Sequence, residues 1–236
     1  MQEKRNAMAA IVTTGRTISP ENIELAQAAA DRLQIPYVAR RTAGLPALKK
    51  KYGADFVLVA KQGLLMLETP GGELFFHPNM AHLRLKNLRG GDPDRMVDAM
   101  GLKPGMSVLD CTLGFGADAI VASYAVGPEG RVTGIESQPL IEAVVGWGLA
   151  HFNGDSPYIL EAMRRVNTVC DDALHYLQQQ ADDSVDVVYF DPMFRHPFMD
   201  STSLDPLRTV ADKRALTPET VAEACRVARH RVVMKE

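Results

Sequence analysis

The chain has 236 residues, of which 46% are hydrophobic and 23% are charged, and its formal net charge is −3. These proportions exclude an intrinsically disordered chain, which has few apolar residues and much uncompensated charge. No apolar run approaches the ~20 residues that span a bilayer, and the N-terminus lacks the apolar segment of a signal peptide. We therefore expect a cytoplasmic protein with no membrane partner.

The net charge conceals two halves of opposite sign. Residues 1–91 contain 13 Lys and Arg against 7 Asp and Glu, a net charge of +6. Residues 92–236 contain 13 against 22, a net charge of −9. This asymmetry indicates two regions with separate roles, although two ordinary solvated surfaces would give the same count. The three cysteines are widely spaced and form no CxxC pair, so they predict neither disulfides nor a metal site.

The first 78 residues alternate short strands and helices and predict a small, basic α/β domain. Ser19-Pro20 begins a helix, Pro36 ends it, and Gln62-Gly63 is typical of a hairpin turn. The expected strands are residues 9–15, 37–39, 56–59, 64–67 and 73–76, and the expected helices are residues 20–34 and 45–53.

A basic stretch, residues 77–93, follows this domain and is interrupted by Gly90-Gly91. Because glycine pairs of this kind are typical of loops, we interpret it as a loop and place the domain boundary here. Asp92 is the expected N-cap of a helix over residues 93–100. Residues 79–104 are thus predicted to be a basic linker and helix that lead into the last domain.

From residue 105 to 236 strands and helices alternate, which predicts a parallel, Rossmann-like α/β sheet with helices on both faces. The segment VDVVYF, residues 185–190, is apolar at nearly every position, as expected for a strand covered on both faces. The predicted strands are residues 106–111, 131–136, 165–170, 185–190 and 230–235, and the predicted helices are residues 118–126, 140–152, 172–180 and 218–228.

Two features at the ends of the first two of these strands favour a nucleoside site. Asp110 is followed by Gly114 and Gly116, and glycines in such a turn let the backbone approach a ligand closely. Glu136 closes the next strand, where a carboxylate accepts hydrogen bonds from the hydroxyls of a ribose. Taken alone, the glycines fit a purely structural turn, and Glu136 fits an exposed acid at the end of a strand. Ala119 leaves a dinucleotide fingerprint open as well.

Acidic residues also end the third and fourth strands. Asp171 and Asp172 stand where a carboxylate accepts from the exocyclic amine of adenine, although Asp172 can equally be a helix N-cap. Asp191-Pro192-Met193-Phe194 follows the buried strand, at the end where open α/β sheets bind ligands. A carboxylate and a carbonyl there accept from an amine while the aromatic ring stacks on its base. We predict that Asp191, Pro192 and Phe194 position an amine for attack.

In this order the four elements resemble class I S-adenosylmethionine (SAM) dependent methyltransferases. More narrowly, the chain is similar to the family of small-subunit ribosomal RNA guanine-N2 methyltransferases, from about Met80 to Lys235. The matching segments are Met80-Ala81-His82 with Arg84, Gly90-Gly91, the string 110–119, the turn 136–139, the helix 139–152, and Asp191-Pro192-Met193-Phe194 with His196. The methionine of the last motif is the most specific feature, whereas Arg195 replaces the proline of that family.

The resemblance implies an enzyme that uses SAM, requires no metal, and methylates an exocyclic base amine of RNA, guanine N2 of the small ribosomal subunit. The implied cofactor-binding residues are Asp110, Gly114, Gly116, Ala117, Asp118, Glu136, Ser137, Asp171, Asp172 and Asp191. The expected substrate-binding residues are His82, Arg84, Lys86, Arg89 and His196. The first four are cationic or titratable and are candidate phosphate contacts, with a solvated basic linker as the alternative.

Three other functions fit part of the pattern. They are a SAM-dependent methyltransferase of a small molecule or protein, a non-catalytic RNA-binding module, and a NAD-binding oxidoreductase. The last shares the glycine turn and Glu136 but leaves the Asp-Pro-Met-Phe motif unexplained. The sequence stops at the predicted fifth strand, so we also expect the C-terminal hairpin of class I methyltransferases to be missing, which leaves an edge strand. The oligomeric state is open, with a dimer as one option.

Overall fold

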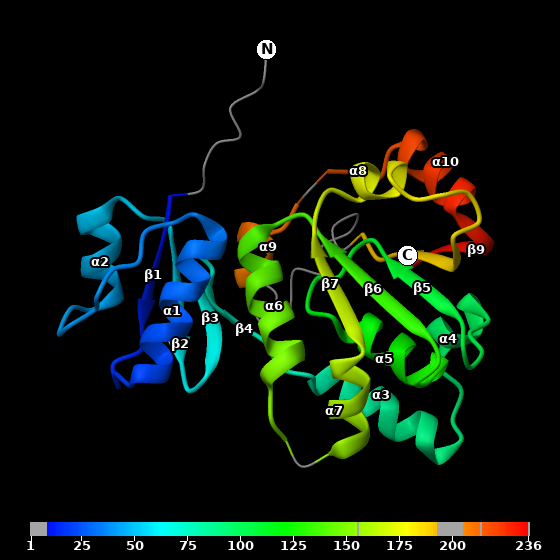
Figure 1. Cartoon of the computed structure of the whole chain (residues 1–236), viewed down its shortest axis with the longest axis horizontal. Coiled ribbons are helices and arrows are strands. Elements are labelled where there is room, and N and C mark those ends of the chain that lie inside the picture. Colours follow the sequence, from blue (N-terminus) through cyan, green and yellow to red (C-terminus); the bar gives the residue numbers. More distant parts are fainter. Residues whose placement is uncertain (1–8, 155, 193–204, 213, 236) are drawn as a thin grey trace. The chain divides into compact units, whose positions relative to one another are not determined.

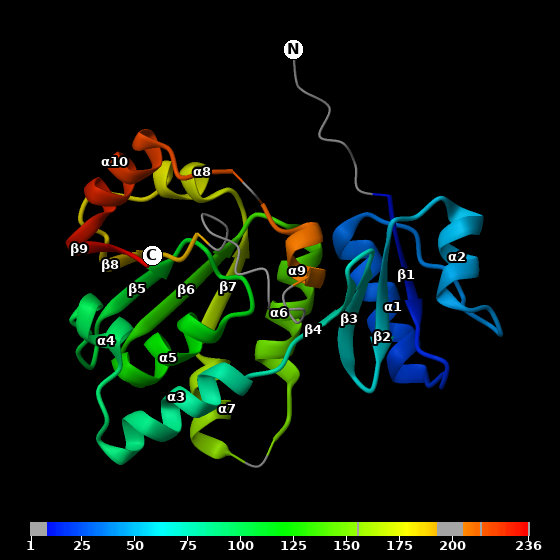
Figure 2. The ribbon, with the colours of Figure 1, turned by 180° about the vertical axis from the view of Figure 1, so that it is seen from behind.

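The computed structural model describes residues 9–154, 156–192, 205–212 and 214–235. These residues form two compact units (Figures 1 and 2). The first unit ends at Phe76 and also contains helix α9 (Asp205–Val210), whereas the second contains the other described residues from His77 onward. Helix α9 therefore belongs to the N-terminal unit, although the sequence analysis assigned its residues to the last domain.

The first unit is built on a four-stranded sheet with the order β1-β2-β3-β4. Strands β1 and β2 are parallel, and the other neighbours are antiparallel. Its elements besides α9 are β1 (Ala10–Thr14), α1 (Pro20–Leu33), α2 (Leu45–Tyr52), β2 (Phe56–Lys61), β3 (Leu64–Thr69) and β4 (Gly72–Phe75). The strand expected at 37–39 is reduced to one parallel bridge between Tyr37 and Val12. Helix α9 packs on β3 and β4 and buries Leu207 completely.

The second unit is a five-stranded parallel sheet with the order β7-β6-β5-β8-β9. Helices α8 and α10 cover one face, and α5 and α6 cover the other, where α3, α4 and α7 also pack (Figure 1). The strands are β5 (Ser107–Asp110), β6 (Arg131–Glu136), β7 (Val166–Cys170), β8 (Val185–Phe190) and β9 (Ala228–Met234). The helices are α3 (Asn79–Gly90), α4 (Arg95–Met100), α5 (Ala117–Val126), α6 (Pro139–His151), α7 (Pro157–Arg164), α8 (Ala173–Gln178) and α10 (Pro218–Val227).

The class of this fold is the predicted one, an α/β Rossmann-like sheet covered on both faces, but three local predictions are wrong. The basic stretch predicted as a loop is helix α3, because Ala81 and Leu85 share one face and are fully buried. The next helix is capped by Asp94 rather than Asp92, since the Asp94 carboxylate accepts from the Met96 and Val97 amides at 3.0 and 3.1 Å. Helix α7 was not predicted at all.

Strand β9 is the edge of the second sheet within the described residues, and no described strand pairs with its outer side. Its partner β8 is fully covered, with Val187, Val188, Tyr189 and Phe190 at most 1% exposed. Among the described residues, none of the helices combines the length and the apolar character needed to cross a bilayer.

Candidate active site

A cavity of about 200 Å³, here called the acidic cavity, lies at the carboxyl ends of the parallel strands of the second unit. It is lined by residues that follow β5, β6, β7 and β8 and by the segment that precedes α10. In an open sheet this edge binds ligands, at the point where the chain crosses from one side of the central strand to the other. The order β6-β5-β8 places that point between β5 and β8.

The turn between β5 and α5 brings backbone rather than side chains to this edge. Gly114 and Gly116 adopt positive φ angles of 49° and 76°, which favour glycine. A Cβ atom at Gly116 would also lie 3.3 Å from Cγ1 of Val145. Gly114 lines the cavity, whereas Gly116 and Ala117 are not among its lining residues. The glycine turn is therefore required by the backbone and also leaves room for a ligand.

Glu136 ends β6 and lines the cavity while only 9% of its surface is exposed. Its carboxylate accepts the amide of Gln138 at 2.9 Å and the amide of Gly114 at 3.3 Å. Burial raises the pKa of Glu136 to about 7, against the lowering effect of these amides. The carboxylate thus joins the glycine turn to the end of the second strand and lines the cavity as an acceptor for hydroxyl groups.

Asp171 and Asp172 line the same cavity beyond β7, but both have protein partners. The Asp171 carboxylate contacts Nδ1 of His175 at 2.8 Å. Asp172 accepts the His175 amide at 3.2 Å and thereby caps α8, as the sequence alternative allowed. Its second oxygen pairs with the Arg214 guanidinium at 2.6 Å. Asp172 therefore both caps α8 and forms part of the cavity wall.

The sequence analysis missed Asp212 and Arg214, which line the cavity from the segment between α9 and α10. They form an ion pair with each other, and Asp212 also accepts from the Ser137 hydroxyl at 3.3 Å. No sequence signal marked them, because they lie far along the chain from any strand end. Arg214 is the only lysine or arginine among the described residues that line the cavity, against five carboxylates.

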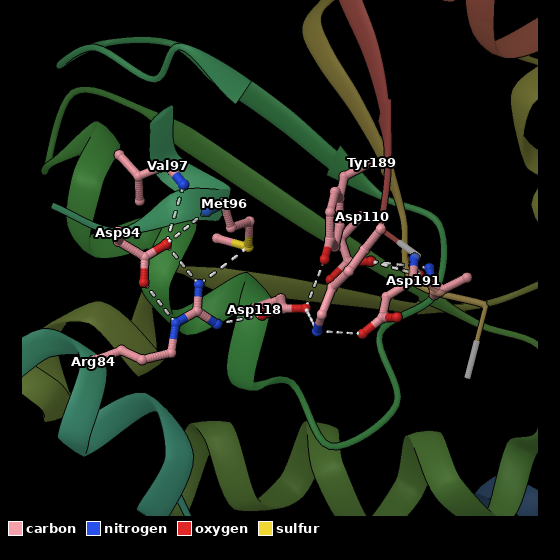
Figure 3. A network of polar contacts seen from close by, with 10 residues as sticks. Arg84, Asp94, Met96, Val97, Asp110, Asp118, Tyr189 and Asp191 are labelled. Carbon is pink, nitrogen blue, oxygen red and sulfur yellow. Dashed lines mark hydrogen bonds and ion pairs between the residues drawn. The ribbon is translucent and has the colours of Figure 1, made fainter. Parts of the chain in front are cut away.

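Asp191 follows β8 and belongs to a connected polar network (Figure 3). Its amide donates to the Thr112 hydroxyl at 2.6 Å, and its Oδ2 accepts from the Lys235 ammonium at 2.7 Å. Its Oδ1 has no partner in the part of the chain that the structure describes, and the residue lines the cavity together with Pro192. Phe194 and His196, predicted to contact the substrate base, lie outside the described residues.

Lys235 was also missed by the sequence analysis. It comes directly after β9 and bridges Asp191 and Asp118, at 2.7 and 3.3 Å. Burial lowers the pKa of Lys235, but the two carboxylates raise it by more than burial lowers it, so the net shift is upward. The rule that identified the other strand-end residues applies to Lys235 as well, since it stands at the carboxyl end of the fifth parallel strand.

Asp118 lies in this network and is not among the residues that line the cavity. It accepts the Tyr189 hydroxyl at 2.8 Å and pairs with Arg84 as well as with Lys235 (Figure 3). Burial raises its pKa, yet Lys235 and Arg84 hold it below its usual value. Asp118, predicted to bind the cofactor, is thus engaged by protein cations and a phenol.

Asp110 is the most deeply buried carboxylate of the network, with 1% of its surface exposed. Its Oδ1 accepts the Thr112 amide at 3.0 Å, whereas its Oδ2 is buried and has no partner within the described chain. Burial raises the pKa of Asp110 to about 7. Asp110 itself is not among the residues that line the acidic cavity.

The four predicted phosphate contacts of α3 divide into two kinds. Arg84 is not a surface cation: it pairs with Asp118 and contacts both oxygens of Asp94 at 2.7 and 2.8 Å (Figure 3). Its interpretation as a phosphate contact is therefore corrected to an internal ion pair. The other three are exposed, namely His82, Lys86 and Arg89. Arg89 lies 4.1 Å from the ring centroid of Tyr158.

The strand order, the glycine turn and the acidic edge together define a Rossmann-like SAM-dependent methyltransferase of class I. The chain matches the model of the family described as "Putative SAM-dependent methyltransferase" over residues 47–236, and it belongs to that family. It is therefore a methyltransferase that uses SAM. Its donor set fits this cofactor, because the cavity wall is rich in carboxylates and SAM carries a sulfonium and an ammonium group.

The chain is also similar to individual proteins, of which YpiP is itself described as uncharacterized. The chain is 38% identical to the Bacillus subtilis protein YpiP over 226 residues, which covers 96% of this chain and 88% of YpiP. It is 32% identical to ribosomal RNA small subunit methyltransferase J of Pseudomonas syringae, over 77% of this chain and 70% of that one. A SAM-dependent methyltransferase from Neisseria gonorrhoeae has the same fold, with a TM-score of 0.51, 18% identity, and coverage of 78% and 70%.

Proposed function

We propose that this enzyme methylates the exocyclic N2 amine of a guanine in small-subunit ribosomal RNA, in the cytoplasm. The observation that carries the proposal is the position of Asp191 and Pro192 at the carboxyl end of β8, directly on the acidic cavity. The similarity to ribosomal RNA small subunit methyltransferases J from two bacteria, at 32% identity each, supports RNA as the acceptor.

In this proposal SAM supplies an electrophilic methyl group, and the residues of the chain position the cofactor and the amine. Glu136 would accept hydrogen bonds from the ribose hydroxyls, and Asp171 and Asp172 would lie by the adenine. Gly114 and Ser137 would line the same pocket. Asp110, which the family resemblance implies as a cofactor residue, would accept a donor from the methionine end through its unpartnered Oδ2. Glu136, Gly114, Ser137, Asp171 and Asp172 line the acidic cavity, which supports these assignments, whereas Asp110 is not among its lining residues.

Asp191 has the central role toward the acceptor. Lys235 holds its Oδ2 in place, while Oδ1 accepts a hydrogen bond from the amine. The Pro192 carbonyl accepts the second hydrogen, and Phe194 stacks on the base. The amine lone pair is thereby oriented, which accounts for most of the rate in a reaction limited by positioning. After transfer the extra proton leaves to Asp191 or to water.

The test compares the purified chain with Asp191→Ala on small-subunit rRNA from a strain that lacks this gene. Nucleoside mass spectrometry is expected to detect N2-methylguanosine with the wild-type chain. Asp191→Ala is expected to lower the rate at least about 100-fold, while calorimetry shows that SAM still binds. Asp92→Ala, an exposed aspartate of the same unit, is the control and keeps full activity.

Other products would contradict the proposal in distinct ways. Methylation of adenine would keep the amine chemistry but assign another base. Methyl transfer to metabolites or proteins with none to free rRNA or assembled subunits would overturn RNA as the acceptor. Full activity of Asp191→Ala with normal SAM binding would overturn the role of Asp191.

A further inference from the structure

The first unit contains a second cavity, of about 450 Å³, here called the basic cavity. Its cationic lining residues are Arg16, Arg40 and Lys61, and the exposed Glu73 is the one carboxylate that the described part of the chain adds to its wall. A volume of this size falls within the range of ligand-binding pockets, which is about 300–1,000 Å³. No role was assigned to this cavity by the sequence analysis.

The topology brings the three cations to one edge of the sheet. Arg16 follows the carboxyl end of β1, and Lys61 ends β2, which runs parallel to β1. Arg40 follows Tyr37, which pairs in parallel with the opposite side of β1. Three chain segments that run in the same direction thus each contribute a cation, at the edge where α/β sheets bind ligands.

Arg40 shows that this edge is a built site rather than a set of surface charges. It is buried, with 8% of its surface exposed, and it donates to the carbonyl oxygens of Ala43 at 3.2 Å and Thr14 at 3.3 Å. No carboxylate pairs with it among the described residues. Burial, and then the nearby charge of Arg16, lower its pKa. A buried cation without a counterion costs free energy unless an anion completes the site.

The remaining nitrogen of Arg40 is available to such an anion. Its Nε and Nη1 are used by the two carbonyls, whereas Nη2 has no partner within the described chain and is not sealed from solvent. Asn22 is also buried, and its Oδ1 accepts the amide of Gly63 at 3.1 Å, which ties the first turn of α1 to the β2–β3 turn. Asn22 also lines the cavity and adds a polar group to its wall.

We propose that the basic cavity binds phosphate groups of the RNA backbone, as the RNA-holding site of the N-terminal unit. This inference rests on the proposed function, which makes RNA the substrate. Guanidinium groups match the geometry of phosphate oxygens, and cations that neutralise phosphates supply most of the sequence-independent affinity for nucleic acids. A free nucleotide offers the same phosphate chemistry, so the test separates the two sources.

The test measures binding of the full chain to transcribed small-subunit rRNA over a range of salt concentrations. The variant is Arg16→Ala with Lys61→Ala, because both side chains are exposed and their loss leaves the core intact. We expect about tenfold weaker RNA binding and a salt slope reduced by about 2. Thermal unfolding and SAM affinity are expected to stay at wild-type values.

The matched control is Lys50→Ala with Lys51→Ala, which removes the same charge from exposed residues of α2 outside the cavity. It is expected to weaken RNA binding less than about twofold, because exposed charges away from the phosphates are screened. Equal losses in the two double variants would overturn the proposal, since a general positive surface would then explain the affinity.

Adenosine monophosphate is the probe for a free nucleotide as the source of the bound phosphate. If it stabilises the wild type but not the Arg16/Lys61 variant, while RNA affinity is the same in both, the cavity binds a free nucleotide and the proposal is wrong. These binding measurements do not depend on whether the enzyme methylates guanine N2. Cavity-dependent RNA binding without N2 methylation would contradict only the proposed function, whereas N2 methylation with an unchanged KM for RNA in the variant would contradict only this inference.

Discussion

The two units carry cavities at the same kind of place but with opposite charge. Each cavity lies at the carboxyl ends of parallel strands, β5 to β8 in the second unit and β1 and β2 in the first. Among the described residues, five carboxylates and one arginine line the acidic cavity, whereas two arginines, a lysine and one glutamate line the basic cavity. The backbone direction therefore sets where a ligand binds, and the side chains set which ligand it is.

The two units also differ in how they balance buried charge. In the second unit Asp118 is held by Arg84 and Lys235, so its charge is compensated inside the protein. In the first unit Arg40 has only carbonyl partners among the described residues. The charge of Asp118 is thus compensated inside the protein, whereas the charge of Arg40 has no counterion among the described residues.

The largest effect is expected from removing an internal cation of the acidic side. Arg84→Met leaves Asp94 and Asp118 without their shared partner and is expected to lower the free energy of unfolding by about 3 kcal/mol. Denaturant unfolding measures this loss. Lys86→Met, two positions along the same helix and exposed, is the control and is expected to change stability by less than about 0.5 kcal/mol. Equal effects would show that Arg84 contributes no more than a surface cation.

The next effect concerns the acceptor at the end of β6. Glu136→Ala removes a buried carboxylate of the acidic cavity, and a charged hydrogen bond of this kind contributes enough that SAM affinity is expected to fall about 30-fold. Calorimetry with SAM measures the change. Glu129→Ala, an exposed glutamate of the same unit, leaves the affinity unchanged. Wild-type affinity in Glu136→Ala would place the ribose elsewhere.

The pH dependence of the two cavities is expected to differ. Because the pKa of Glu136 is raised to about 7, its carboxylate is mostly neutral at pH 6 and mostly ionised at pH 8. SAM affinity is therefore expected to rise about tenfold over this range. Calorimetry at several pH values measures it, and Glu136→Gln is expected to flatten the profile. RNA binding through the arginines shows no such rise, because they stay charged.

The raised pKa values of Asp110 and Glu136 also make the stability of the folded protein depend on pH. Asp110 and Glu136 have folded-state pKa values of about 7 against ordinary values of 3.8 and 4.5. The folded protein therefore keeps protons that the unfolded chain has released. These two groups make stability fall as the pH rises from about 4 to about 7, with no further change above it.

The smallest effect is expected at Arg214, the one lysine or arginine among the described residues that line the acidic cavity. Its side chain is 69% exposed and pairs with Asp172 and Asp212. Exposed ion pairs contribute little, so Arg214→Ala is expected to change SAM affinity no more than about threefold. Calorimetry at low and high salt tests this. A change far beyond that would mean that Arg214 contacts the cofactor directly.

Much of the second unit was predictable because parallel strands leave a clear signal. The buried run at 185–190 and the alternation of strands and helices are local patterns, and each predicted strand of this sheet is present. Helices α3 and α7 were missed because their apolar faces are short and interrupted by charged residues. Gly114, Glu136, Asp171 and Asp191 all follow the carboxyl ends of parallel strands. These ends share one edge of the sheet, and the four residues line one cavity there.

The sequence by itself determined the fold class of the second unit, the order of its strands along the chain and the acids at their ends. Only the tertiary structure decided which charges meet. It paired Arg84 with Asp118, brought Lys235 to Asp191, and placed Arg214 on the cavity and Arg40 beside Arg16. The physical reason is that the two members of each pair lie tens of positions apart in the sequence. Their proximity depends on packing that no local pattern records.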